Sequence, residues 1–554
     1  MIPSSRALLL QVVIALFVCP LFAQAPEHLT HDQAFQDARE FVHLLETAHP
    51  DPYSNLGGKV AFERKAEDLY KAIPAEGLDV PGLRDRLAAF IAPLHDGHTR
   101  VGGRSDKWSD DSPKLTVEFQ IASDGLLISA SDLPELKGLR GSRLLAVNGI
   151  TVDQLLERMS QQVATENQYG TYVGLTIVLR SSKLLSNLIP GLDRASGVTY
   201  TLQTPAGQRI ERKISWGGTH PEDSQKWVDQ SLYWPGLKRS EDPFYYRFLP
   251  DGKTAYFRVA NMMPREGYEI VEKYHVGNLK EFLAEYYKRH NRPMPADTAA
   301  ALAGIPSLFE QGTNLLNEMK RRNTPNLIVD LRGNGGGSTP TFIPFIYQLF
   351  GDTYFARATG AQFVQVKSEL YLQKYNSTVA EERKKDPNFE VGEYEFTSSY
   401  EGKTTEEKRI KRISDFSEHH MSFAPALEAM NGKPLYTPKR LVVLCDPGVF
   451  SAAFQAMFYL HDVGAVVVGV PSAQSPNAFM EATPFTLTIS KIPGSISNGM
   501  QMFMPDNPRA NIFHPDFEVT YSTYKKYGFD DETALRYAVD LLAAGKIATP
   551  AKTE

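Results

Sequence analysis

Cysteine is almost absent from this sequence, which has 2 cysteines, Cys19 and Cys445, in 554 residues. Cys19 lies in an N-terminal segment that we expect to be removed, so the mature chain would keep Cys445 alone and form no intrachain disulfide. A basic excess is missing as well, because the net charge is −6. Proteins that bind nucleic acids normally carry clustered positive charge. We therefore expect a folded protein without disulfides that does not bind nucleic acid.

The N-terminal apolar run, Ala7 to Val18, is too short to be a membrane anchor. A bilayer-spanning helix needs roughly 20 apolar residues, and Pro20 follows this run closely. Arg6 before the run and Ala23-Gln-Ala25 after it are typical of a signal peptide. We expect residues 1–25 to be cleaved from an exported bacterial protein. The mature protein would then be periplasmic or secreted and would have no membrane span.

Common nucleotide-binding and hydrolase motifs are also missing. The glycine-rich segment 333–337 matches neither G-x-x-x-x-G-K-[ST] nor G-x-G-x-x-G. Ser451 lies outside any G-x-S-x-G, which disfavours an α/β-hydrolase. The glycine turn is therefore not expected to bind a nucleotide. We expect a site that uses no cofactor and no metal.

The most informative segment that is present is Asn326-Leu-Ile-Val-Asp-Leu-Arg-Gly-Asn-Gly-Gly-Gly-Ser-Thr339. Its apolar first half predicts a strand buried on both faces. The glycines after it permit backbone torsions and exposed N–H groups that residues with side chains resist. Something is therefore expected to approach this backbone closely.

A second unit of the same kind follows about 110 residues later. Arg440-Leu-Val-Val-Leu-Cys-Asp446 predicts a strand, and Pro447-Gly-Val-Phe-Ser-Ala-Ala-Phe454 runs from it into an apolar helix. Ser451 would stand where the strand turns into the helix. One turn could supply donors for an oxyanion and the other a nucleophile, which is the minimum equipment for acyl transfer.

A candidate base lies far upstream, in Leu94-His-Asp-Gly-His-Thr-Arg-Val101. Asp96-Gly97 is a turn signal, so His98 is predicted to stand on a tight turn beside a carboxylate. His95 has less turn context and is the weaker candidate. By spacing alone, either histidine could also be an ordinary surface or core residue.

The predicted organisation has four parts after the signal peptide of residues 1–25. Residues 26–110 carry helical periodicity, and residues 111–215 show period-two strand patterning. Residues 216–245 have no clear period and are predicted to be a linker. Strand-turn-helix units fill residues 246–545, so we expect an α/β multidomain protein. We expect the β-rich part, 111–215, to contribute no catalytic group.

These motifs together resemble the tail-specific, or C-terminal-processing, serine peptidases, in the branch related to the tricorn core protease. Leu327 to Gly337 resembles the central strand and glycine turn of that family, and Asp446 to Phe454 its nucleophile segment. The stretch from Gly141 to Gly149 resembles the PDZ-like module that many members carry. The resemblance implies a crotonase-like (ClpP/crotonase) catalytic core that acts on protein or peptide substrates.

Members of this family differ in their general base. Some use a lysine roughly 25 residues after the serine, but here no lysine follows Ser451 until Lys491. The tricorn-like branch takes its histidine from an N-terminal segment, and Asp96-Gly-His-Thr99 is similar to that segment. The resemblance thus implies His98 as the base. In this family the carboxylate that orients the histidine is expected late in the chain. Near the corresponding position this sequence has Arg509, which is not a carboxylate. Glu481, Asp506 and Asp516 remain open as candidates.

The sequence therefore predicts hydrolysis of peptide bonds through an acyl-enzyme on Ser451. His98 would take the serine proton, since histidine titrates near working pH. Backbone N–H groups of Gly335 or Gly336 and of Ala452 would hold the oxyanion. Two rivals stay open at this point: a non-catalytic binding protein on the same fold, and another acyl-transfer enzyme such as a thioesterase. The oligomeric state and the substrate are not indicated by any pattern.

Overall fold

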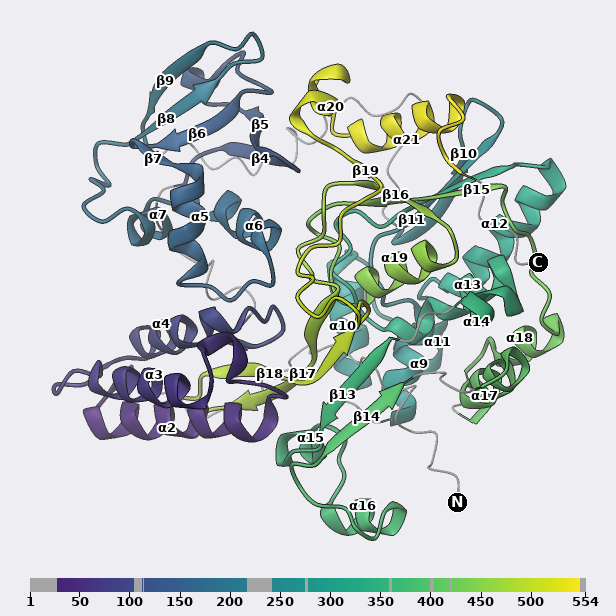
Figure 1. Cartoon of the computed structure of the whole chain (residues 1–554), viewed down its shortest axis with the longest axis horizontal. Helices are drawn as coiled ribbons and strands as arrows, with labels where there is room; N and C mark the ends of the chain where they lie inside the picture. The colour runs from purple at the N-terminus through teal and green to yellow at the C-terminus, as the bar shows by residue number, and fades with distance from the viewer. Residues whose placement is uncertain are drawn as a thin grey trace.

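The structure is a computed structural model, and it describes residues 27–103, 112, 114–216, 242–274, 278–357, 361–398, 403–418 and 421–548. The predicted signal peptide and most of the predicted linker lie outside these residues. The chain is a mixed α/β protein of several packed parts (Figure 1). In the described part of the chain, no helix is long and apolar enough to cross a membrane.

The N-terminal part is helical, as its periodicity predicts. It consists of α2 (His31–Ala48), α3 (Lys59–Lys71) and α4 (Val80–Ile91), with the short strands β1 (His28–Leu29) and β2 (Leu78–Asp79) paired antiparallel. Thr30 and Gln33 form a capping box that fixes the start of α2. Phe41, Phe62 and Leu87 are among the buried side chains that join the three helices into one core. This core continues onto two long strands of the C-terminal half, described below.

The next part is a sheet lobe, residues 114–216, which lies beside the helical part and the remaining core (Figure 1). Its strands run in the order β4-β5-β6-β8-β9, with β7 paired to β6. They are β4 (Val117–Ala122), β5 (Gly125–Ser131), β6 (Arg143–Val147), β7 (Ile150–Thr151), β8 (Val198–Gln203) and β9 (Arg209–Ile214). Three helices pack on the sheet: α5 (Val152–Ser160), α6 (Gln168–Val178) and α7 (Ser182–Leu188).

The largest part is built on a six-stranded sheet in the order β10-β11-β12-β15-β16-β19. Its strands are β10 (Phe244–Phe248), β11 (Thr254–Val259), β12 (Asn326–Asp330), β15 (Arg440–Cys445), β16 (Val466–Gly469) and β19 (Phe517–Glu518). From β11 onward, neighbouring strands are parallel, and β10 joins β11 antiparallel. All five residues of β12 are buried, as its unbroken apolar pattern predicts. Strand β10 begins at Phe244, next to the predicted domain boundary at 246.

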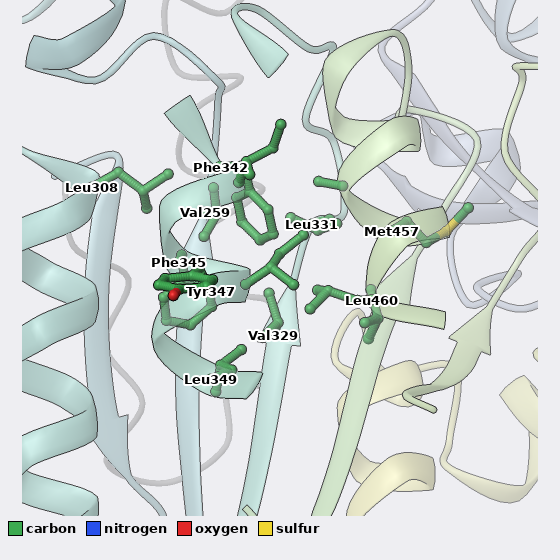
Figure 2. Packing of buried hydrophobic residues seen from close by; sticks show 14 of the residues in the cluster. Val259, Leu308, Val329, Leu331, Phe342, Phe345, Tyr347, Leu349, Met457 and Leu460 are labelled. Carbon is green, nitrogen blue, oxygen red and sulfur yellow. The ribbon is translucent and has the colours of Figure 1, made fainter. Parts of the chain in front are cut away.

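Alternate residues of these strands serve two different cores. Leu327 and Val329 point into the larger core, which is closed by α12 (Leu308–Arg322), α13 (Ile343–Phe350) and α19 (Ala452–Asp462). Figure 2 shows Phe342, Phe345 and Leu460 packed around Val329 and Leu331. Ile328 points to the other face, which α21 (Thr533–Ala543) covers. The sheet is therefore buried on both sides, and its carboxyl ends form the edge where ligands of parallel sheets are usually bound.

A smaller sheet connects the core to the N-terminal helices. Its order is β14-β13-β18-β17, formed by β13 (Gln362–Val366), β14 (Tyr394–Ser398), β17 (Asn477–Thr486) and β18 (Pro493–Met502). Strand β3 (Arg100–Val101) of the N-terminal part pairs with β18, so residues next to His98 are tied to the C-terminal half. The remaining helices are α9 (Arg265–Tyr274), α10 (Leu279–Arg289), α11 (Thr298–Ala303), α14 (Asp352–Arg357), α15 (Glu369–Lys374), α16 (Val379–Lys385), α17 (Thr405–Glu418), α18 (Ala424–Met430) and α20 (Tyr521–Lys526).

Candidate active site

Ser451 stands on the turn between β15 and α19, where the sequence predicts it. Its backbone has φ 54° and ψ −126°, a conformation that residues with side chains rarely adopt, and it forms the N-cap of α19. Such strain is concentrated at functional turns and persists only where the surroundings enforce it. Gln474 helps to enforce it, because its side-chain oxygen accepts the backbone N–H of Ser451.

The glycine turn after β12 packs directly against this nucleophile turn. A Cβ added to Gly336 would lie 2.6 Å from the carbonyl oxygen of Phe450 and 2.7 Å from Cβ of Ser451. The φ of Gly336 is +96°, which also favours glycine. The close approach predicted from the sequence is therefore an approach of the chain to its own nucleophile segment.

The predicted oxyanion donors are only partly available. The N–H of Gly336 donates to Asn334 Oδ1 at 3.0 Å, so the predicted use of this group as an oxyanion donor is corrected. Within the described residues, the backbone N–H groups of Gly335 and Ala452 have no internal acceptor. Ala452 is the first residue of α19, where N–H groups have no partner inside the helix. Gly335 and Ala452 therefore remain as the pair of donors beside Ser451.

Asp446 fastens the two turns together. Its Oδ1 accepts the N–H of Gly333 at 2.8 Å and the N–H of Gly448 at 2.9 Å. Phe450 adds a third link by donating its N–H to the carbonyl of Asn334 at 3.0 Å. Burial raises the pKa of the Asp446 carboxyl, although the Gly333 N–H opposes this. A single carboxylate thus holds the turn of the candidate nucleophile against the turn of the candidate oxyanion donors.

His98 lies at the same site, although 353 positions separate it from Ser451 in the sequence (451 − 98). Its ring stacks on Phe450, with centroids 4.8 Å apart and planes at 28°. The backbone next to His98 is held from the C-terminal half, since Ser495 Oγ donates to the His98 carbonyl at 2.8 Å. The structure therefore brings the two predicted catalytic residues together.

The turn under His98 is an aspartate turn, as the Asp96-Gly97 signal predicts. Asp96 is fully buried, and its Oδ1 accepts the His98 N–H at 2.8 Å. Its Oδ2 lies 3.2 Å from Nε2 of buried His49. The Asp51 N–H donates to Nδ1 of His49 at 3.1 Å, so the proton of that ring sits on Nε2 and points at Asp96. Although burial by itself would raise the pKa of Asp96, these donors hold it well below its usual range.

The carboxylate that faces the ring of His98 is Glu166, which the sequence did not indicate. Glu166 Oε1 lies 3.5 Å from His98 Nδ1, and both side chains are almost wholly buried. Glu166 belongs to the sheet lobe, so a side chain of residues 111–215, which we expected to contribute no catalytic group, reaches the candidate site. Nothing in the local sequence marks this residue, because a glutamate before a helix is common on protein surfaces. Only the docking of the lobe brings it to His98.

The carboxylates proposed from the sequence lie elsewhere. Asp516 accepts the Val467 N–H at 2.8 Å and lies 3.7 Å from His461. Asp506 is exposed. Glu481 borders the same cavity as His98, but its Oε2 pairs with Lys374 Nζ at 3.2 Å. Asp506 and Asp516 are therefore not placed at His98, and Glu481 acts on it as a neighbouring charge in the same cavity, whereas Glu166 lies within ion-pair distance of the ring.

The charges around His98 control its protonation. Burial alone would lower the pKa of His98, but the nearby Glu166 carboxylate outweighs this effect and raises that pKa from its ordinary value. Asp96 and Glu481 act in the same direction. Burial raises the pKa of Glu166, opposed by His98 and by the Ser475 N–H. A raised pKa suits a group that must hold the proton of a serine during acyl transfer.

Ser451 and His98 border one cavity of about 1430 Å³, together with Gly335, Gly336 and Glu481. It is large enough for a peptide segment, since sites for small ligands usually measure roughly 300–1000 Å³. Its walls come from the helical part, the sheet lobe and the core, including Arg84, Val163, Leu184, Met263, Phe450 and Met480.

One group of side chains near the site has the composition of a metal-binding set. Asp96, His98 and Glu166 each offer an atom, and these atoms lie within 4.8 Å of one another. Both oxygens of Asp96 already accept hydrogen bonds, and Glu166 Oε2 accepts the Ser475 N–H at 2.8 Å. We therefore interpret the group as a proton-transfer unit, in which the carboxylates fix and polarise the histidine.

Comparison with known proteins agrees with this geometry. Residues 308–486, which include the glycine turn and Ser451, match the model of peptidase family S41. This match covers the segment with the two turns and leaves the rest of the chain unmatched, so the chain is similar to peptidase family S41 over residues 308–486. As the sequence predicts, the chain is a serine peptidase of mixed α/β multidomain fold. His98 and Glu166 lie outside the matched segment, so their roles rest on the geometry alone.

Solved structures share the fold of this chain. The structure of mature CPAF complexed with lactacystin is 16% identical, with a TM-score of 0.53, and the match covers 93% of this chain and 99% of that chain. Another structure of mature CPAF is 16% identical with a TM-score of 0.52, over 93% of this chain and 98% of that one. At this identity the likeness establishes the fold and no more. No curated protein matches the sequence.

Proposed function

We propose that this serine peptidase is an exported endopeptidase that cleaves protein substrates through an acyl-enzyme on Ser451. The observation that carries the proposal is the juxtaposition at one cavity of a strained serine turn, free backbone donors, and a histidine facing a buried carboxylate. These are the groups that nucleophilic acyl transfer requires.

In the proposed reaction, His98 takes the proton of the Ser451 hydroxyl as Oγ bonds to the scissile carbonyl carbon. Glu166 fixes the ring and stabilises the imidazolium that forms. The N–H groups of Gly335 and Ala452 donate to the carbonyl oxygen as it becomes an oxyanion. His98 then protonates the leaving amine as the C–N bond breaks. A water, deprotonated by His98, attacks the ester, releases the acid and restores the serine.

The two other parts of the proposal come from the sequence. We infer from residues 1–25 that the protein is exported, and N-terminal sequencing of the secreted chain should find Gln24 or Pro26 first. A chain that still begins with Met1 would contradict this. For the lobe at 111–215 we keep the PDZ-like assignment as a proposal, in which extended peptide ends add a strand to its sheet. Deleting it would then remove Glu166 as well as a substrate site.

The test of the reaction is active-site labelling. A fluorophosphonate should label the wild-type protein at one site, and peptide mapping by mass spectrometry should find the label on Ser451. Ser451→Ala should take up no label and hydrolyse no peptide. Hydrolysis rates measured in parallel on a panel of fluorogenic peptides and acyl thioesters distinguish a peptidase from a thioesterase. Label on another residue, or peptide hydrolysis by Ser451→Ala, would reject the proposed mechanism.

A further inference from the structure

Residues 165–167, which we call the docking loop, connect the sheet lobe to the core beside His98. Asn167 in this loop has all its hydrogen-bonding capacity in use. Its Oδ1 accepts the N–H groups of Tyr169 at 2.9 Å and Gly170 at 3.3 Å, which caps the start of α6. Its Nδ2 donates to the carbonyls of Ser472 at 3.0 Å and Asn511 at 3.1 Å, which belong to the core. One buried side chain therefore joins a helix of the lobe to two loops of the core.

Glu166, the preceding residue, is held by the same core loop. Its Oε2 accepts the Ser475 N–H at 2.8 Å, and its carbonyl accepts Ser475 Oγ at 3.2 Å. Ser475 Oγ also lies 2.8 Å from the Asn511 carbonyl, and its single proton can be donated to either carbonyl, so the docking loop and the core share one small network. The other oxygen of Glu166, Oε1, accepts no hydrogen bond from the described residues and lies 3.5 Å from His98 Nδ1.

We propose that Asn167 is a positioning residue that holds Glu166 against His98 and thereby makes catalysis depend on docking of the sheet lobe. The inference rests on the proposed function of Ser451 and His98. The two Nδ2 hydrogen bonds form only when the lobe is docked, and they lie one residue from the carboxylate. Losing them leaves the carbonyls of Ser472 and Asn511 without this donor and frees the loop to shift.

A plain helix-capping role does not account for the choice of asparagine. Serine, threonine and aspartate cap helices as well as asparagine does, but none of them also offers two N–H donors. Asn167→Ser is therefore the informative change, because serine keeps a capping oxygen and removes both bonds to the core. Thr151→Ala is the matched control, since exposed Thr151 caps α5 in the same lobe through hydrogen bonds with Gln154 of that helix.

The experiment measures kcat and its pH dependence for a peptide that the wild-type enzyme hydrolyses. Asn167→Ser should lower kcat by about 10-fold to 100-fold, because a shift of about 1 Å in catalytic geometry has that effect. In a Glu166→Gln background, the same change should lower kcat by less than about 2-fold, since residues acting as a unit are non-additive. Thr151→Ala should keep wild-type kcat.

The pH profile separates positioning from mere loss of folded protein. The charged groups facing His98 are Glu166 from the docking loop, Asp96 from its own turn and Glu481 from β17. When Glu166 moves away, the pKa of His98 falls, so the acid limb of kcat should move to lower pH. A loss of folded protein would lower kcat at every pH and leave the limb in place.

The outcomes are distinct. The proposal is overturned if Asn167→Ser keeps the wild-type kcat or leaves the acid limb of the pH profile unshifted. It is also overturned if Asn167→Ser lowers kcat as much in the Glu166→Gln background as in the wild-type enzyme. If Asn167→Ser does not fold, Ser475→Ala tests the same network from the core side and should shift the limb in the same direction. Absence of any Ser451-dependent hydrolysis in the wild-type enzyme would instead reject the proposed function itself.

Discussion

The two neighbouring glycines, Gly335 and Gly336, should respond very differently to alanine. At Gly336, an added Cβ meets the Phe450 carbonyl oxygen at 2.6 Å and Ser451 Cβ at 2.7 Å, on a backbone with φ +96°. At Gly335, it meets no heavy atom within 4 Å, and no left-handed φ is involved. The same chemical change therefore tests whether packing of the glycine turn on the nucleophile turn sets the geometry of Ser451.

The expected magnitudes follow from these contacts. A positive φ costs alanine about 1–2 kcal/mol. Forcing a methyl group into a filled site costs about 1–3 kcal/mol. We therefore expect Gly336→Ala to lower the free energy of unfolding by about 2–5 kcal/mol, and Gly335→Ala to change it by less than about 0.5 kcal/mol. The added Cβ of Gly336→Ala and the Cβ of Ser451 need a separation near 3.5 Å, so the two turns must move apart by about 0.8 Å. A displacement of the nucleophile by this amount should slow acylation by about 100-fold.

Urea unfolding followed by circular dichroism gives the stability difference. The second-order rate of fluorophosphonate labelling, corrected for the folded fraction, gives the effect on Ser451. The small label keeps steric effects on a long peptide out of the measurement. Wild-type labelling by folded Gly336→Ala, or a larger stability loss in Gly335→Ala, would refute the argument that this packing positions the nucleophile.

Three further predictions concern the base and the two turns. Ser451→Ala and His98→Ala should each lower peptide turnover by several orders of magnitude. The double variant should be little worse than either single variant. His95→Ala changes an exposed ring, and its loss of turnover should be smaller than that of His98→Ala by a factor of at least about 100. Glu166→Gln should move the acid limb of kcat to lower pH, because the raised pKa of His98 depends on this carboxylate and the neutral histidine is the active form; an unchanged limb in a stopped-flow pH series would contradict this. Asp446→Asn keeps the acceptor for Gly333 and Gly448 and removes a partly buried charge. Because burial raises the pKa of Asp446, the urea midpoint of this variant should match or exceed that of wild type, increasingly so as pH rises above the acidic range. Asp446→Ala should lose about 0.5–1.5 kcal/mol for each of the two hydrogen bonds, since the exposed Gly333 N–H can bond to water instead.

Local chemistry explains which parts of the site could be predicted from the sequence. The buried strand β12 and the start of α19 at Ser451 follow from apolar runs that end in turn residues. His98 could be placed on a turn because the Asp96 side chain reaches its own backbone two residues on, which is a property of aspartate in any fold. These are effects that act over a few residues.

The parts that were missed depend on contacts between distant segments. Glu166 becomes part of the site only through bonds to Ser475, 309 positions away in the sequence (475 − 166), and no local pattern encodes that pairing. Gly336 was expected to donate its N–H to substrate, but Asn334 folds back and takes that donor. The sequence pattern predicts that a glycine is required there. It does not tell whether the requirement comes from a hydrogen bond or from close packing.

The wide separation of His98 and Ser451 along the chain also has a consequence for biosynthesis. Ribosomes add roughly 5–20 residues per second, so about 20–70 s pass between synthesis of the base and synthesis of the serine 353 positions later. Strand β18, which pairs with β3 next to His98, is made later still. A nascent chain therefore cannot bring Ser451 and His98 together, or hold the backbone beside His98, until the residues of β18 have been translated. The proposed reaction at Ser451 would be impossible throughout that interval.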